Sequence, residues 1–289
     1  MVISIEELKD VARRAGALAL SMQGTVEAQA KDVDEPDAYY RRQKSAFSEA
    51  DGKVQELILT LLAKNHAGRF GIITEEDVKD ATSFTHMNRF VDDGFTLIID
   101  PIDGSANYLG AHHSWWGVSL CLAKGTTPVS GVIFYPALDV MLSVTDDETF
   151  IDGKRVRVDD GASFHESDFV RVSGALGTQT AKIRSCLGQR APEHTGSFVV
   201  TFLSLFGVAA LPLCRAYIGG GLPVHDIGCS ALAWRKAGGL VLDMRAQDIE
   251  PFSSWYTDVD CVRQKEMFMY APSKRYATEF VDHIRSALD

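Results

Sequence analysis

A chain of 289 residues is long enough to bury a sizeable core, either as one large domain or as two packed halves. Its 46% hydrophobic and 24% charged residues are ordinary for a folded protein, so disorder is not the expected state. The formal net charge of −10, with no long basic run, argues against a nucleic-acid polymer as partner, since phosphate backbones require a concentrated positive surface. An acidic protein can still bind an anionic ligand when metal ions supply the positive charge.

The five cysteines are widely spaced and none belongs to a C-x-x-C pair, which favours reduced thiols over a disulfide scaffold or a thiolate zinc site. The N-terminal segment has no basic stretch followed by an apolar run, so we expect no signal peptide and a cytoplasmic protein. The apolar segment 197–214 is nearly long enough to cross a bilayer. Because Pro212 interrupts it and Arg215 follows it, we expect a buried helix and a short strand rather than a membrane span.

The first half of the chain predicts two helices followed by short strands. Ser4 with Glu7 forms a capping-box pattern that opens an amphipathic helix, and Ser48 with Asp51 begins a second one. The polar segment 31–44 between them is expected to be a loop. Strands are predicted at 70–74, 96–100, 116–123, 130–135 and in the hairpin-like segment 141–158.

The second half predicts an alternation of strands and helices. In chain order these are a strand at 169–174, a helix at 179–188, the apolar helix, a strand at 215–219, a helix after Asp226, strands at 240–244 and 267–271, and a last helix capped by Ser273. The change of pattern predicts an α/β (α+β) fold of two subdomains in contact. Residues 1–158 would hold the helix pair, the antiparallel sheet and most acidic motifs, and residues 159–289 a smaller α/β half that contributes Asp226.

The strongest local signal is TLIIDPIDGSANY at 96–108. A strand rich in β-branched residues is expected to end in Asp100, and Pro101 to hold a tight turn after it. In such a turn the carboxylates of Asp100 and Asp103 and the intervening Ile102 carbonyl can converge. Three oxygen ligands from four residues are what a hard cation such as Mg²⁺ requires.

Further groups could complete a site around this turn. Gly104 and Ser105 look like the start of a helix, whose free N–H groups would face a phosphate. Glu75 and Glu76 also follow an apolar strand, and Asp226 begins a predicted helix. Taken singly, each has an ordinary explanation, because an aspartate at that place commonly caps a helix and a glutamate pair commonly lies in a solvated turn.

The ordered set of motifs resembles the inositol monophosphatase family of lithium-sensitive, magnesium-dependent phosphatases, which also includes nucleotide 3′-phosphatases and fructose 1,6-bisphosphatases. The matching segments are I-T-E-E at 73–76, D-P-I-D-G-S-A-N-Y at 100–108, H-D-I-G-C at 225–229 and A-G-G at 237–239. They extend in order and spacing over most of the chain. The resemblance implies a layered αβαβα sugar-phosphatase fold, a homodimer, and inhibition by Li⁺.

By position, the resemblance implies two or three Mg²⁺ ions. Glu75, Asp100 and the Ile102 carbonyl would hold one, Asp100, Asp103 and Asp226 a second, and Glu75 would share a third. The reaction implied is hydrolysis of a phosphate monoester of a small metabolite (a sugar, polyol or inositol phosphate) by metal-activated water, without a covalent intermediate.

The resemblance also assigns roles to the groups that would face the substrate. Those implied in binding it are Asp103, Gly104, Ser105 and Asp226, and those implied in catalysis are Glu75, Glu76 and Ser105. Backbone N–H groups of Gly104 and Ser105 would bind the phosphate, and the Ser105 hydroxyl would be oriented toward the attacking water.

One expected catalytic carboxylate is missing. Family members usually carry an aspartate just upstream of a V-T-x-x-D segment, where this chain has Ser45 or Gln43, depending on the subgroup that is aligned. Three explanations stay open: Glu75 or Glu76 takes the proton of the activated water, a carboxylate of the acidic loop 32–37 (Asp32, Asp34, Glu35, Asp37) moves in, or turnover is weak.

Other departures concern the substrate. Gly219 stands where inositol-preferring members carry a glutamate, His225 replaces the family tryptophan, and Lys236 replaces a glutamate. We therefore do not expect inositol phosphate to be the natural substrate. The main alternative is a 3′(2′),5′-bisphosphate nucleotidase, with which the segment 43–48 aligns without a gap. An alternative of another class is a catalytically weak homologue that binds metal and a phosphorylated ligand as a sensor.

Overall fold

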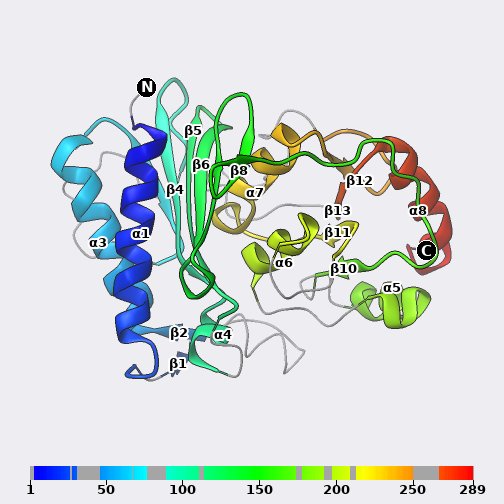
Figure 1. Cartoon of the computed structure of the whole chain (residues 1–289), viewed down its shortest axis with the longest axis horizontal. Coiled ribbons are helices and arrows are strands. Elements are labelled where there is room, and N and C mark those ends of the chain that lie inside the picture. Colours follow the sequence, from blue (N-terminus) through cyan, green and yellow to red (C-terminus); the bar gives the residue numbers. More distant parts are fainter. Residues whose placement is uncertain are drawn as a thin grey trace.

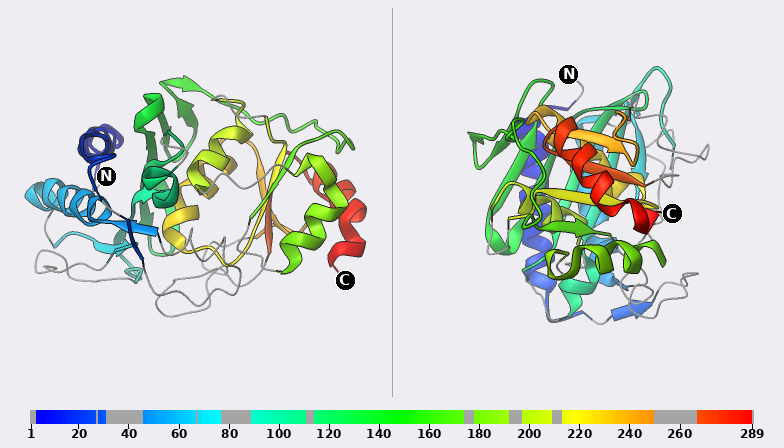
Figure 2. Two further views of the ribbon diagram at one scale, coloured as in Figure 1. Left: turned by 90° about the horizontal axis from the view of Figure 1, so that it is seen from below. Right: turned by 90° about the vertical axis from the view of Figure 1, so that its right-hand side faces the viewer.

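The computed structural model describes residues 3–26, 28–30, 46–66, 68–76, 89–110, 114–173, 178–191, 197–208, 213–249 and 267–288. Its elements form alternating layers: a helix pair, a seven-stranded sheet, central helices, a four-stranded sheet and an outer helix pair (Figure 1). The predicted layered α/β fold is confirmed. The left view of Figure 2, seen from below, also shows the central helices between the two sheets.

The first layer consists of α1 (Ile5–Met22) and α3 (Glu49–His66). As predicted, the hydroxyl of Ser4 caps α1 by accepting the backbone N–H of Glu7 at 3.2 Å. Both helices bury their apolar faces against one side of the large sheet, with which they share a hydrophobic core. This layer therefore holds the start of α3 in a fixed place beside the sheet.

The large sheet has the strand order β3-β4-β5-β6-β7-β8-β9, and only the β3–β4 pair is parallel. Its strands are β3 (Gly71–Thr74), β4 (Phe95–Asp103), β5 (Gly117–Lys124), β6 (Thr127–Tyr135), β7 (Val140–Val144), β8 (Thr149–Ile151) and β9 (Lys154–Arg155). A separate short pair is formed by β1 (Ala28–Ala30) and β2 (Ala46–Ser48).

The strand predicted at 96–100 corresponds to β4. The expectation that it ends at Asp100 is wrong, because β4 continues to Asp103. Asp100 pairs with Ser119 and Asp103 pairs with Gly117, so the register shifts between the two aspartates. The physical reason is a bulge. Pro101 has no N–H to donate to the ladder, and an irregular step accommodates it without ending the strand.

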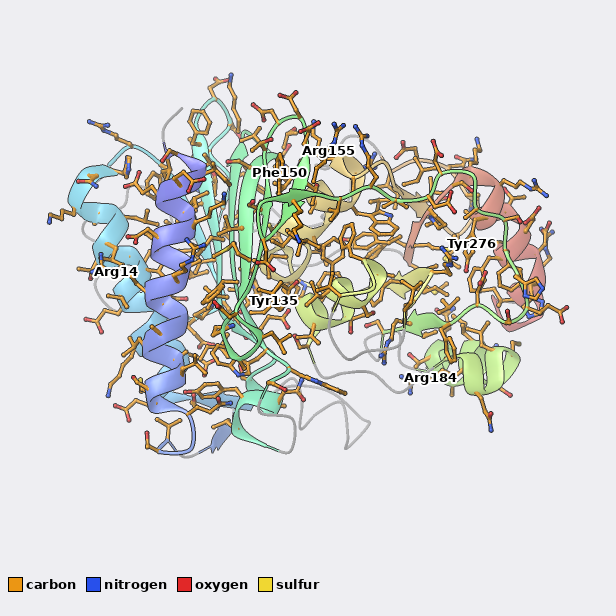
Figure 3. The ribbon with its side chains drawn as sticks, viewed as in Figure 1. Arg14, Tyr135, Phe150, Arg155, Arg184 and Tyr276 are labelled. Carbon is orange, nitrogen blue, oxygen red and sulfur yellow. The ribbon has the colours of Figure 1, made fainter. Side chains whose placement is uncertain are left out.

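The central layer contains α6 (Phe198–Leu205) and α7 (Val224–Lys236). The other side of the large sheet packs against them, and Figure 3 shows Tyr135 on that side. The hydroxyl of Tyr135, which is fully buried, donates to the backbone carbonyl of Val199 at 2.9 Å. Sheet and helix are therefore joined by a hydrogen bond as well as by apolar contact.

The second sheet has the strand order β10-β11-β13-β12. Its strands are β10 (Val170–Val172), β11 (Ala216–Gly219), β12 (Leu240–Asp243) and β13 (Phe268–Ala271), and the outer helices are α5 (Thr178–Leu187) and α8 (Lys274–Leu288). Ser273 caps α8 as predicted, accepting the N–H of Tyr276 at 3.1 Å. Division of the chain into subdomains at residue 158 stays a prediction.

Residues 198–205 of the apolar segment form the short helix α6, every residue of which is buried. Within the described ranges of the chain, no helix is both long and apolar enough to cross a membrane.

Candidate metal centre and active site

Three aspartates from two elements meet at the bulge in β4. Asp100 and Asp103 come from the strand, and Asp226 comes from the first turn of α7. Each offers a carboxylate oxygen that lies within 4.8 Å of the others. The ordinary explanation of Asp226 as an N-cap is wrong, because α7 begins at Val224 and its N-cap is Pro223. The carboxylate is therefore not used as a cap for this helix.

A second group of carboxylates consists of Asp51, Glu75 and Glu76, again with oxygen atoms within 4.8 Å of one another. Asp51 comes from the first turn of α3, and the glutamates follow β3. Gln55 fixes this corner, since its amide donates to the Glu76 carbonyl at 2.8 Å and accepts the Glu76 N–H at 3.2 Å. The glutamate pair is thus held in place and does not lie in a free solvated turn.

The two groups influence each other electrostatically. Burial, followed by the negative charges of Glu75, Asp103, Asp226 and Asp51, raises the pKa of Asp100 well above its usual value. Burial also raises the pKa of Asp51, with Glu75 as the next cause. Gathering carboxylates out of water is costly unless a cation or protons compensate the charge. The site is therefore built to hold positive charge.

One atom points to a cation in particular. Oδ1 of Asp100 is buried and, among the described residues, has no hydrogen-bond partner. Buried polar atoms are nearly always paired, and an exception calls for an explanation such as an ion. Carboxylate and carbonyl oxygens are the ligands that Mg²⁺ prefers. The donor set fits the implied metal.

Asp103 is also tied to the central layer. Ser197, the N-cap of α6, donates its hydroxyl to one oxygen of Asp103, and the N–H of Val199 donates to the other at 3.2 Å. Burial raises the pKa of Asp103 to about 7, although these donors act in the opposite direction. The sequence analysis gave no role to Ser197, whose only local signal is its place before an apolar helix.

Gly104 makes the close approach of α6 possible. It is the N-cap of α4 (Ser105–Leu109) and has a φ of 94°, which a residue with a side chain rarely adopts. A Cβ at this position would lie 2.7 Å from the Cβ of Ser197 and 3.0 Å from the carbonyl oxygen of Trp115. The predicted helix start at 104–105 is present.

Ser105 connects the two acidic groups. Its hydroxyl lies 2.7 Å from Oδ1 of Asp51 and 3.0 Å from the Ile102 carbonyl, the proposed metal ligand. The sequence analysis considered Asp51 only as part of a helix start. Ser45, Gln43 and the acidic loop 32–37, the positions considered for the missing carboxylate, lie outside the described residues.

Gly219, the position considered for substrate recognition, lies at the end of β11 in the second sheet. At Gly219 an added Cβ would lie 2.6 Å from Cε1 of Tyr217 and 2.7 Å from Cζ of Phe268. The position where a glutamate was considered is thus occupied by aromatic rings. Nε2 of His225 lies 3.4 Å from Oδ1 of Asp226, whereas Lys236 lies in the last turn of the same helix, far along it from Asp226.

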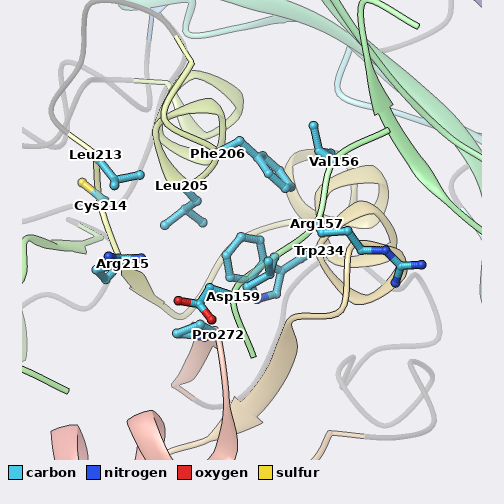
Figure 4. Close-up of a pocket in the computed structure, with 11 residues that line it drawn as sticks. Val156, Arg157, Asp159, Leu205, Phe206, Leu213, Cys214, Arg215, Trp234 and Pro272 are labelled. Carbon is cyan, nitrogen blue, oxygen red and sulfur yellow. The ribbon is translucent and has the colours of Figure 1, made fainter. Parts of the chain in front are cut away.

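A cavity of about 250 Å³ lies elsewhere, between the segment 156–159 and the central helices (Figure 4). Its apolar lining includes Leu205, Phe206 and Trp234. None of the clustered carboxylates lines it, so this cavity is separate from the acidic site.

Comparison with known proteins agrees with this geometry. Residues 4–284 match the model of the inositol monophosphatase family. The chain belongs to this family. Members of the family are phosphatases, so the chain is a phosphoric monoester hydrolase.

Individual relatives are distant. The inositol-1-monophosphatase of Mesorhizobium japonicum is 26% identical over 213 residues, which cover 68% of this chain and 71% of that protein. The fructose-1,6-bisphosphatase/inositol-1-monophosphatase of Thermotoga maritima is 28% identical over 166 residues, 54% of this chain and 59% of that protein. The structure of the extragenic suppressor protein suhB from Bartonella henselae superposes with a TM-score of 0.72 at 18% identity, covers 97% of each chain, and shows the fold.

Proposed function

We propose that this family member is a Mg²⁺-dependent phosphatase that hydrolyses the phosphate monoester of a small sugar or polyol by direct attack of water. The observation that carries the proposal is the buried Oδ1 of Asp100, which has no hydrogen-bond partner among the described residues and belongs to one of two groups of carboxylates that influence each other. Because phosphate esters are themselves anionic, such a site can bind them only with cations present.

The proposed ligands divide between two ions. Glu75, Asp100 and the Ile102 carbonyl would hold one, and Asp100, Asp103 and Asp226 would hold the other. When bound, Mg²⁺ would lower the pKa of a water molecule and neutralise charge on the phosphate and on the leaving oxygen. The protein contributes geometry, since Asp100 and Asp103 are fixed by the sheet and Asp226 by a buried helix. Glu76 lies beside Glu75, where it can accept a proton.

The phosphate would be bound where α4 begins. There the proposed ligands end at Asp103, and the N–H groups of Gly104 and Ser105 follow directly in the chain. The hydroxyl of Ser105 lies between both acidic groups, in a place from which it can orient the attacking water. Positioning and charge neutralisation are the principal sources of rate acceleration in phosphoryl transfer.

A sugar or polyol phosphate is favoured over inositol phosphate by the packing around Gly219. An added Cβ at Gly219 would meet the rings of Tyr217 and Phe268, and the chain has no carboxylate at this position to bind inositol hydroxyls. The name of the Thermotoga relative, a fructose-1,6-bisphosphatase as well as an inositol-1-monophosphatase, supports a sugar phosphate. A homodimer, inhibition by Li⁺ and a cytoplasmic location stay predictions of the family resemblance.

The test is phosphate release from a panel of sugar phosphates, inositol phosphates and adenosine 3′,5′-bisphosphate, each with Mg²⁺ and with a chelator. We expect Mg²⁺-dependent release that is fastest for a sugar or polyol phosphate. Fastest release from the bisphosphate would instead establish the nucleotidase. No release from any substrate, together with tight binding of one of them, would overturn the proposal in favour of a sensor.

A further inference from the structure

A second candidate site is the cavity between the segment 156–159 and the central helices (Figure 4). Its volume of about 250 Å³ exceeds the roughly 150 Å³ of an apolar cavity that binds benzene. We propose that this cavity binds a free α-amino acid with a large apolar side chain, such as phenylalanine. The side chain fills the cavity, and the charged groups of the amino acid stay at the mouth. This inference does not depend on the proposed phosphatase function.

The floor of the cavity is apolar and buried. It is formed by Leu205, Cys214, Trp234 and Pro272, all of them buried, and by the half-buried ring of Phe206. The rings of Phe206 and Trp234 lie edge to face, with their centroids 5.5 Å apart. Because aromatic rings favour this arrangement, a further ring can pack against the pair in the same way.

The largest polar group of the floor is already satisfied. The Nε1–H of Trp234 donates to the carbonyl oxygens of Leu240 at 3.1 Å and Ala271 at 3.2 Å. This indole therefore offers its apolar ring, and not its N–H, to a ligand. Apolar cavities bind apolar groups because the ligand leaves water without losing hydrogen bonds. The part of the ligand that enters is thus expected to be apolar.

The mouth of the cavity carries two opposite charges. Asp159 and Arg215 are exposed lining residues, and neither forms an ion pair with the other or with any other described residue. Oδ1 of Asp159 accepts the Gly161 N–H at 3.2 Å, which fixes the carboxylate through one of its oxygens. Figure 4 shows this carboxylate directed toward the side on which Arg215 lies. A ligand with one ammonium and one carboxylate group complements both charges.

Ligands with a single charge fit this mouth less well. A simple anion would be repelled by Asp159, and a simple cation would be repelled by Arg215. The third charged lining residue, Arg157, does not change this balance, because its guanidinium points away from the other lining side chains (Figure 4). A dipolar molecule with an apolar side chain matches the floor and the mouth together, and a free α-amino acid is the simplest such molecule.

The cavity is not a part of the acidic site. It meets α6 at the C-cap Phe206, whereas the N-cap of this helix, Ser197, contacts Asp103. It meets α7 at Trp234, which lies eight residues after Asp226 and so about 12 Å farther along the helix axis. An amino acid in the cavity therefore does not compete with a phosphorylated substrate for the clustered carboxylates.

The first test compares ligands of the wild-type protein by isothermal titration calorimetry, with a chelator and without any phosphorylated compound. We expect phenylalanine to bind, and three analogues to bind at least about tenfold more weakly, since each lacks one group that the cavity recognises. The analogues are glycine without the side chain, phenylpropionate without the ammonium group, and phenethylamine without the carboxylate. Equal binding of any analogue would overturn the inference, as would no binding of phenylalanine at millimolar concentration.

Two variants test whether binding takes place in this cavity. Arg215→Gln and Asp159→Asn each remove one charge from the mouth, and each should weaken phenylalanine binding about tenfold. In Asp159→Asn the amide oxygen can still accept the Gly161 N–H, so the local turn is kept. The matched controls are Arg157→Gln, whose guanidinium points away from the cavity, and Asp160→Asn, an exposed neighbour that does not line it. Both controls should bind phenylalanine like the wild type.

Unchanged affinity in Arg215→Gln and Asp159→Asn would overturn the inference, because phenylalanine would then bind elsewhere. An equal loss of affinity in the controls would also overturn it, since a general change of surface charge would explain the result. All four substituted positions are exposed, so each Tm should stay close to that of the wild type. A protein that binds phenylalanine but hydrolyses no substrate would contradict only the proposed function, whereas an active phosphatase that does not bind phenylalanine would contradict only this inference.

Discussion

The two sheets pack against the same central helices, but they differ in the side chains that they bring close to the candidate site. The large sheet brings acidic groups to its edge at the β4 bulge and after β3, where the proposed metal ligands lie. The small sheet contributes packed aromatic rings, among them those of Tyr217, Phe268 and Tyr270. Only α7, which carries Asp226, joins the acidic group from this half of the chain.

The difference suggests that different parts of the molecule serve metal binding and substrate choice. Metal chemistry depends on charges held at fixed strand ends, and these come from short, local motifs. In the proposed phosphatase, substrate choice would depend on the shape of a surface that is assembled from residues far apart in the chain. The proposed metal chemistry can be tested by removing a carboxylate charge, and the proposed basis of substrate choice by disturbing the packing of the aromatic rings.

The largest effect is expected from Asp100→Asn. The substitution removes a charge that both proposed ions would share, and a neutral amide is a poor ligand for Mg²⁺. We expect kcat/KM for the best substrate to fall by at least about 10³-fold, which corresponds to about 4 kcal/mol of transition-state stabilisation. The measurement is Mg²⁺-dependent phosphate release. If the variant keeps its activity, the acidic edge of the large sheet does not perform the chemistry.

Asp10→Asn is the matched control for this charge change. Asp10 lies on the exposed face of α1, 3.8 Å from Arg14, with 68% of its side chain exposed. Surface ion pairs of this kind contribute little, so activity should stay within about two-fold of the wild type.

The next largest effect is expected on the aromatic side, from Gly219→Glu. The new side chain would begin 2.6 Å from Tyr217 and 2.7 Å from Phe268, and it would place a carboxylate among rings. Overpacking costs about 1–3 kcal/mol, and we expect the upper end of that range, seen as a loss of about 5 °C or more in Tm. No hydrolysis of inositol phosphate should be gained.

Gly161→Glu is a fair comparison for that variant, because its position is exposed and has only an Asp159 oxygen, at 3.5 Å, within 4 Å of an added Cβ. Its Tm should change little. A stable Gly219→Glu protein with new activity toward inositol phosphate would mean that the aromatic side rearranges readily, and the contrast between the two sheets would be lost.

This contrast also explains what sequence could and could not predict. The α/β fold class follows from strand and helix patterns, the layer order from the family resemblance, and the candidate ligands Asp100, Asp103 and Asp226 from motifs a few residues long. The continuation of β4 through Pro101 was missed, because a proline after a strand usually signals its end.

The roles of Asp51 and Ser197 were missed for a different reason. Each serves as, or belongs to, a helix cap, so the local sequence already has a full explanation for it. Only the tertiary fold brings these caps to Ser105 and Asp103. The candidate metal ligands could therefore be predicted from the sequence, whereas the contacts of Asp51 with Ser105 and of Ser197 with Asp103 could not.

A third prediction concerns stability and the charge of the acidic edge. The pKa of Asp103 is raised to about 7, and that of Asp100 is raised well above its usual value, in both cases chiefly by burial. Between about pH 4 and pH 7 the folded protein then holds protons that the unfolded chain has lost, so without metal its free energy of unfolding falls as pH rises through this window.

Mg²⁺ should restore the free energy of unfolding at the higher pH values, at which the carboxylates are ionised. At a concentration about 100 times its Kd, the ion contributes about 2.7 kcal/mol. We therefore expect Mg²⁺ to raise Tm by several degrees at about pH 8 and by much less at about pH 5, where protons compete for the same oxygens. Thermal unfolding in Mg²⁺ and in chelator, at both pH values, measures this. An equal or larger increase at the lower pH would contradict it.

The smallest effect is expected from Ser197→Ala, which changes the contact between the start of α6 and Asp103. The variant loses the N-cap of α6 and one donor to Asp103, while the Val199 N–H still binds the other oxygen. We expect a loss of about 1 kcal/mol in stability and a fall in kcat of about ten-fold at most. Calorimetry and steady-state kinetics give the two numbers.

Ser4→Ala separates the effect of losing a helix cap from the effect of losing the hydroxyl contact with Asp103. Ser4 caps α1 through the same kind of bond, 3.2 Å to the Glu7 N–H, but contacts no carboxylate of the site. Both variants should lose similar stability, and only Ser197→Ala should lose turnover. If the two variants keep the same kcat, the Ser197 hydroxyl is not needed to orient Asp103, and β4 together with the Val199 N–H is sufficient to hold it.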